Sequence, residues 1–178
     1  MQTDFTMREP KASDRTLIIG NDHGGYLAKV EIVKHLQNKQ IGVTDAGTDS
    51  EQIVRYPHYV RQVAGAVAGG RFTRGILICS TGIGMSIAAN KFKGIRAALC
   101  TTSYMAKMTR RHNDSNILCL GGKITGIFEL LDIVDTWLST DFEGGRHCIS
   151  LDLIREMEEE LGLQLPPIGQ DPHEPRSR

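Results

Sequence analysis

The chain has 178 residues with 21 basic and 21 acidic side chains, so its formal net charge is zero. A neutral chain without a basic run lacks the positive surface that binds nucleic acid. No apolar run reaches the roughly 18–20 residues that cross a membrane. The length suits one domain of ordinary size, and we expect neither nucleic-acid nor membrane partners.

The two ends of the chain differ from its middle. Residues 1–14 are polar without periodicity, and residues 164–178 are rich in proline. We expect flexible tails at 1–14 and 164–178 around one domain at 15–163. The start lacks the apolar stretch of a secretory signal, so we expect a cytoplasmic protein with reduced cysteines.

The middle of the chain alternates short apolar runs with segments of helical periodicity. The strand candidates are residues 16–20, 41–45, 75–79, 95–100 and 116–120. The helix candidates are residues 27–36, 60–67, 83–91, 103–111, 125–138 and 149–161. Apolar strands separated by helices form a parallel sheet covered on both faces. The pattern predicts an α/β fold, a Rossmann-like doubly wound sheet of five parallel strands in three α/β/α layers.

The strongest candidate site is the string CSTGIGMS at residues 79–86, where a cysteine ends a strand and a glycine-rich turn begins a helix. Amides at a helix start favour anions, and the same positive field favours a thiolate. The pattern indicates Cys79 as a base or nucleophile beside an anion site. The alternative is a buried cysteine before a structural turn. The turn matches neither phosphate-loop nor dinucleotide motifs, so we expect no cofactor.

Polar residues follow the first strand in the string NDHGG at residues 21–25. Asp22 either caps the next helix or, with His23, binds hydroxyls or phosphate and moves protons. Tyr56 lies in the string YPHY at residues 56–59, where it either packs a loop or walls a polar ligand.

Two further candidates lie later in the chain. His112 and Asn113 end a predicted helix, where His112 is a general acid–base on the rim of the site or simply complements the helix end. Arg146 lies in the glycine-rich string FEGGRH at residues 142–147, which suits a phosphate, although a solvated arginine is the alternative.

Other chemistries lack their motifs. The sequence holds no H-E-x-x-H, no paired-histidine spacing with carboxylates, no C-x-x-C and no G-x-S-x-G. We therefore expect neither a metal site nor a serine hydrolase. Cys100 and Cys119 lie in apolar runs and are predicted to pack in the core.

Together these strings resemble the ribose-5-phosphate isomerase B family, which includes the galactose-6-phosphate isomerase subunits. The matching strings are NDHGG at 21–25, YPHY at 56–59, GILICSTGIGMSIAANK at 75–91, GIRAALC at 94–100, RHNDSN at 111–116 and FEGGRH at 142–147. The resemblance implies a metal-independent aldose–ketose isomerase of a small phosphorylated sugar. It also implies a homodimer, or a dimer of dimers, with shared active sites.

The resemblance further implies roles for the matched positions. Cys79 would move a proton between C1 and C2 of the sugar through a cis-enediolate, with Thr81 in the catalytic loop. His112 would open the sugar ring, and Asp22 would assist at the hydroxyls. The implied substrate-binding residues are His23, Tyr56, Ser80, Gly82, Gly84, Ser86, Asn113, Lys123 and Arg146.

Four positions differ from the usual family pattern, namely Arg55, Ser80, Lys123 and Ser150. Ribose 5-phosphate and ribulose 5-phosphate are the leading substrate pair. The alternatives are a tetrose 4-phosphate, a galactose or allose 6-phosphate, or a non-catalytic module that binds a sugar phosphate.

Overall fold

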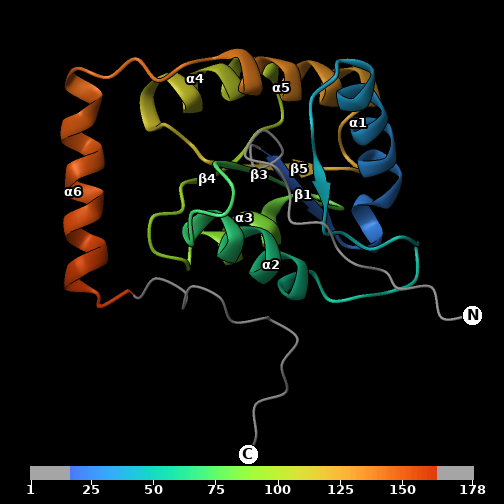
Figure 1. Cartoon of the computed structure of the whole chain (residues 1–178), viewed down its shortest axis with the longest axis horizontal. Coiled ribbons are helices and arrows are strands. Elements are labelled where there is room, and N and C mark those ends of the chain that lie inside the picture. Colours follow the sequence, from blue (N-terminus) through green and yellow to red (C-terminus); the bar gives the residue numbers. More distant parts are fainter. Residues whose placement is uncertain (1–16, 164–178) are drawn as a thin grey trace, which may run out of the picture.

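A computed structural model describes residues 17–163 of the chain (Figure 1). Five parallel strands form one sheet in the order β2-β1-β3-β5-β4. The strands are β1 (Leu17–Asn21), β2 (Thr44–Asp45), β3 (Arg74–Cys79), β4 (Ala97–Leu99) and β5 (Ile117–Gly121). The prediction of a five-stranded parallel sheet is confirmed.

Helices cover both faces of the sheet, which gives the predicted three layers (Figure 1). The helices are η2 (His23–Gly25, a 3-10 turn), α1 (Tyr26–Asn38), α2 (Tyr56–Ala68), α3 (Ile83–Ala89), α4 (Ser103–Asn113), α5 (Ile127–Ser139) and α6 (Arg146–Glu160). One hydrophobic core lies between the sheet and α1, α4 and α5, with Trp137 fully buried in it. A second core lies between the sheet and α2 and α3.

The three central strands are buried along nearly their whole length because helices pack on both of their faces. β3 pairs with β1 from Leu17↔Arg74 to Asn21↔Ile78, and with β5 from Gly75↔Ile117 to Cys79↔Gly121. This register brings the carboxyl ends of β1, β3 and β5 to one edge of the sheet.

Two details near the edge strand β2 differ from the sequence prediction. The predicted strand at 41–45 shortens to Thr44–Asp45. In α1, Leu27 and Val30 are 63% and 40% exposed although they recur at helical spacing. Lys29 is buried instead, and its Nζ bonds Asp45 at 2.6 Å. This ion pair and the packing against the sheet set the buried face of α1.

The last helix, α6, stands apart from the three layers at one end of the molecule (Figure 1). None of its residues is buried. A hydrogen bond of 2.9 Å from the Gly94 amide to Glu158 holds it to the loop before β4. Its attachment within the chain is therefore slight.

The predicted core cysteines are confirmed, since Cys100 and Cys119 are 1% and 0% exposed. Burial raises the pKa of the Cys100 thiol to about 12 and raises that of Cys119 as well. The predicted tails at 1–14 and 164–178 lie outside the described residues, and the domain limits at 15–163 stay a prediction. Within residues 17–163, no helix has the length and apolar character to span a membrane.

Candidate active site

The chain changes direction in the sheet between β1 and β3, because β2 lies on one side of β1 and β3 lies on the other. Open α/β sheets bind ligands at the carboxyl ends of strands beside such a reversal. Asp22 directly follows β1, and Cys79 ends β3. The two residues are close, since the Asp22 amide donates to the carbonyl of Ile78 at 3.1 Å.

Cys79 lies beneath the glycine-rich turn and is 7% exposed. Its Sγ accepts a hydrogen bond of 3.0 Å from the Gly82 amide. Gly82 has φ of +77°, and a Cβ there would lie 2.5 Å from the Leu99 side chain. Glycine at this position therefore allows the turn that aims an N–H dipole at the sulfur.

The turn between Cys79 and α3 has its own internal bonds. The Ile83 amide donates to Thr81 Oγ1 at 3.4 Å, and the Ser86 hydroxyl donates to the Ile83 carbonyl at 3.0 Å. Amides in the first turn of a helix have no partner within the helix. The loop thus places a thiol beside the start of a helix, where backbone amides favour negative charge.

Asp22 performs the structural role that its sequence context allowed. Its Oδ1 accepts a bond of 2.8 Å from the Gly24 amide, which caps η2. Gly24 packs tightly on the Cys79 loop, because a Cβ there would lie 2.2 Å from Ser80 Oγ. The carboxylate is therefore fixed beside the Cys79 loop.

His23 is oriented by the loop that precedes α2. The Val54 amide donates to His23 Nδ1 at 3.3 Å. An N–H can only donate, so Nδ1 is the acceptor, and the neutral ring carries its proton on Nε2. Nε2 is then the atom that can donate to a phosphate oxygen.

Two more predicted residues lie at this edge. The Tyr56 ring packs on Gly84, where a Cβ would lie 3.0 Å from ring carbon Cζ. Lys123 belongs to the loop after β5, and its amide donates to the Ser80 carbonyl at 3.1 Å. Its side chain is exposed and adds a positive charge to the rim.

The structure brings together one set of predicted residues at the carboxyl edge. This set consists of Asp22, His23, Tyr56, Cys79, Ser80, Thr81, Gly82, Gly84, Ser86 and Lys123.

His112 and Asn113 lie at the opposite, amino edge of the sheet. They end α4, which starts beyond β4 and runs back along the sheet. Arg96, just before β4, bonds the Asn113 carbonyl at 3.0 Å and Asp114 at 3.0 Å. The expectation that His112 shares the Cys79 rim within one chain is therefore wrong. The reason is that α4 runs back along the sheet from Ser103, and at about 1.5 Å per residue it carries His112 roughly 14 Å back.

A second cluster forms around His112 at this amino edge. Its ring stacks on that of His147, with centroids 4.3 Å apart and planes 11° apart. Glu143 Oε2 lies 3.7 Å from His112 Nε2, 3.9 Å from His147 Nε2 and 3.2 Å from Arg111. Arg146 starts α6 beside His147 and is exposed.

Glu143 and His147 are part of this cluster, but their sequence pattern predicts no role for them. Both occur in the string FEGGRH, in which the predicted phosphate-binding residue is Arg146. His112 and His147 are 35 positions apart, so no short spacing motif links them. Their meeting depends on the contact between α4 and the start of α6.

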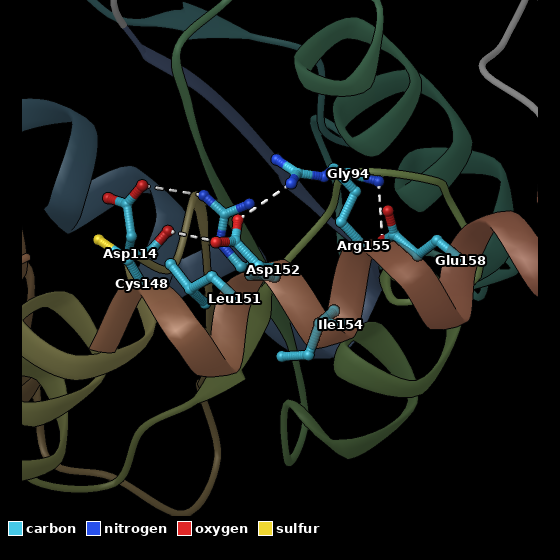
Figure 2. A pocket seen from close by; sticks show the side chains of 9 residues that line it. Gly94, Asp114, Cys148, Leu151, Asp152, Ile154, Arg155 and Glu158 are labelled. Atoms are coloured by element: carbon cyan, nitrogen blue, oxygen red, sulfur yellow. Dashed lines mark hydrogen bonds and ion pairs between the residues drawn. The ribbon is translucent and has the colours of Figure 1, made fainter. Parts of the chain in front are cut away.

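A cavity of about 310 Å³ lies between α6 and the loops before β4 and after α4 (Figure 2). Its lining includes Arg96 and Asp114 from these loops, and Cys148 and Leu151 from α6. The cavity therefore lies at the amino edge and not at the Cys79 loop. It shows how loosely α6 contacts its own chain.

A parallel α/β sheet with a thiol and a glycine-rich helix start at its reversal point defines an enzyme class that acts on small anionic ligands. The family described as Ribose/Galactose Isomerase matches residues 17–154. The chain belongs to this family.

Individual relatives agree with the family match. Ribose-5-phosphate isomerase B of Escherichia coli K12 is 48% identical over 145 residues, which cover 82% of this chain and 97% of that protein. The structure of ribose-5-phosphate isomerase B from Clostridium thermocellum has 51% identity and a TM-score of 0.80, covering 82% of this chain and 99% of that one. The Mycoplasma genitalium enzyme with bound ribulose-5-phosphate has 38% identity and a TM-score of 0.78, covering 82% and 97%.

Proposed function

We propose that the protein interconverts ribose 5-phosphate and ribulose 5-phosphate. The observation that carries the proposal is Cys79 at the end of β3, with its Sγ bonded to the Gly82 amide at 3.0 Å. The similarity to ribose-5-phosphate isomerases B over 82% of the chain supports the pentose as substrate.

In the proposed reaction, the Cys79 thiolate removes the proton from C2 of the open-chain aldose. The C–H electrons form the C1–C2 double bond, and negative charge moves to the C1 oxygen. The thiol then returns the proton to C1, while one hydroxyl proton passes from O2 to O1. A positioned base contributes about 10²–10⁴-fold, and a donor aimed at the developing oxyanion contributes about 3 kcal/mol.

Other residues bind the substrate or open its ring. His112 would transfer the proton that opens the cyclic sugar, with Asp22 near its hydroxyls. His23 Nε2, Lys123 and Arg146 offer donors to the phosphate. Binding energy from the phosphate, which does not react, then positions the reacting carbons.

The location of His112 supports a homodimer with shared active sites. Six strand residues of β3 span about 20 Å, and they separate the edge with Cys79 from the edge with His112. A five-carbon phosphate is far shorter than this. In our proposal, His112, Asn113 and Arg146 of one copy therefore complete the Cys79 site of another, in a dimer or a dimer of dimers.

The surface of α6 supports the same assembly. Ile149, Leu153, Met157 and Leu161 recur every four residues and are 65%, 55%, 59% and 76% exposed. Residues four apart share one helix face, so they form an apolar stripe. A stripe of this length without cover is typical of a protein interface. We propose that a second copy covers it.

Turnover on phosphosugars of four to six carbons, followed in deuterated solvent, tests the function. We expect the highest kcat/KM on ribose 5-phosphate and solvent deuterium at C1 of the ribulose 5-phosphate formed. A higher kcat/KM on a tetrose or hexose phosphate would overturn the assignment of ribose 5-phosphate as the substrate. Binding without any exchange would indicate a sugar-phosphate sensor instead of an enzyme.

A further inference from the structure

Three side chains of the types that bind metals meet at the amino edge of the sheet. His112 comes from α4, Glu143 from the loop after α5, and His147 from α6. One ligand atom from each lies within 4.8 Å of the others, and no other His, Cys, Asp or Glu group among residues 17–163 meets this condition. Two of the three side chains are imidazoles, which bind transition metals, so the group differs from an ordinary cluster of surface carboxylates.

The spacing of the three atoms suits a tetrahedral ion. Metal–ligand bonds of about 2.0–2.2 Å give ligand-to-ligand edges near 3.4 Å. The Glu143 Oε2 edges to His112 and His147 are 3.7 and 3.9 Å, only a few tenths of an ångström longer. The histidine rings are now parallel, so each must rotate about χ2 to aim Nε2 at one point. That torsion is broad in histidine.

Contacts around the three side chains hold Glu143 near the histidines and also limit the affinity of the group for a cation. The Glu143 amide donates to the Arg111 carbonyl at 3.0 Å, which holds the loop against α4. Arg111 also lies 3.2 Å from Glu143 Oε2, so its guanidinium competes with a cation for this oxygen. The Arg111 side chain is 39% exposed and therefore has room to move away.

We propose that His112, Glu143 and His147 bind one Zn²⁺ ion per chain, and that bound Zn²⁺ inhibits the isomerase. Two imidazoles and a carboxylate are a ligand set that zinc accepts, with a fourth position left to water. The ion occupies Nε2 of His112, the residue that we propose transfers the ring-opening proton. The inhibition rests on the proposed function, whereas the binding does not.

Isothermal titration calorimetry of the untagged, chelator-treated full chain with zinc chloride tests the binding directly. We expect one Zn²⁺ per chain. His147→Ala and Glu143→Gln should each weaken the affinity at least tenfold, while Arg111→Gln should strengthen it. Binding that survives His147→Ala unchanged, or no binding to the parent protein, would overturn the proposal.

Two cysteine variants provide the matched control for a thiol site. Cys148→Ser removes the exposed thiol next to His147, and Cys79→Ser removes the thiol of the catalytic loop. We expect both to keep the affinity of the parent, and Co²⁺ bound in place of Zn²⁺ to lack a thiolate charge-transfer band. Loss of binding in either variant would place the ion on sulfur and overturn the proposal.

Inhibition is measured separately, as isomerase turnover over the same Zn²⁺ range. We expect half-inhibition near the calorimetric Kd and full recovery with a chelator. If Zn²⁺ binds and isomerase turnover is undiminished, the proposed inhibition is overturned. If the protein turned over no pentose phosphate at all, the calorimetry would still decide the binding, so the two proposals fail separately.

Discussion

The two edges of the sheet are built in different ways. At the carboxyl edge, close contacts such as Gly24 on Ser80 hold the Cys79 loop within its own chain. At the amino edge, α6 has no buried residue and carries an exposed apolar stripe. The Cys79 loop is held in place by contacts within one chain, whereas the amino edge offers surfaces that a second copy can cover.

This difference separates two kinds of contribution to the proposed site. The Cys79 thiol, which we propose as the base, and the Gly82 amide are positioned by packing inside one subunit, where small shifts are costly. His112 and Arg146 are positioned by α4 and α6, so in our proposal they reach a substrate only after association. Variants at the two edges should therefore fail in different ways.

The largest effect is expected at Cys79 itself. Cys79→Ser replaces an ionisable thiol with a hydroxyl of similar size, so kcat should fall about 10³-fold while the circular dichroism spectrum is unchanged. Cys148→Ser, at an exposed thiol on α6, should retain activity within about twofold. Turnover of the first variant within a few-fold of the parent would remove Cys79 as the base.

The next largest effect is expected on the α6 stripe. Leu153→Asp should place a charge in the proposed interface and weaken self-association at least 100-fold, because a buried unpaired charge is costly. Sedimentation velocity would show monomers, and activity should fall with dimer content. Glu156→Ala, an exposed position on the same helix, is the control. A parent protein that sediments as a monomer would contradict the shared site.

Two glycines, one near each edge of the sheet, allow the packing of the edges to be compared through the free energy of unfolding. Gly82 and Gly94 have φ of +77° and +76°, but only at Gly82 would a Cβ meet neighbours, with Leu99 at 2.5 Å. Gly94→Ala should cost about 1 kcal/mol of unfolding free energy from backbone strain alone. Gly82→Ala should cost about 3 kcal/mol, since crowding adds to the strain. Equal losses in urea unfolding would show that the turn is not tightly packed.

The smallest effect on stability is expected from the ion pairs that Asp135 makes with Lys39 and His35. Burial would raise the pKa of Asp135, but hydrogen bonds from Lys39 and His35, together with their charges, hold it below its usual value. Because the folded pKa is lowered, the stabilisation is present above the unfolded pKa near 3.9 and is lost as the pH falls through the folded value. Asp135→Asn should lower the unfolding free energy by up to about 1 kcal/mol at pH 6, and by less as the pH falls toward 3.

Asp152 on α6 is the matched control for this measurement. It pairs with Arg155 at 3.1 Å, with both side chains more than half exposed. Asp152→Asn should change stability little at any pH, because an exposed pair is screened by water. A loss equal to that of Asp135→Asn would argue against the difference between the body of the protein and α6.

Local sequence determined most of the sheet and the chemistry of its carboxyl edge. The apolar runs at 75–79 and 116–120 are β3 and β5 within one residue, because fully buried strands have no polar face that could mislead. Cys79 and its glycine turn form a continuous string, so their proximity needs no tertiary information.

Only the tertiary structure decided where His112 lies and what accompanies it. Helix α4 reverses the chain and moves its last turn, which includes His112, to the far edge of the sheet. A string of residue types does not reveal this. The meeting of His112, Glu143 and His147 likewise depends on packing between elements that are distant along the chain. The order of residue types along a short segment reflects the local geometry of the backbone. Contacts between separate helices arise only when the cores on both faces of the sheet are assembled.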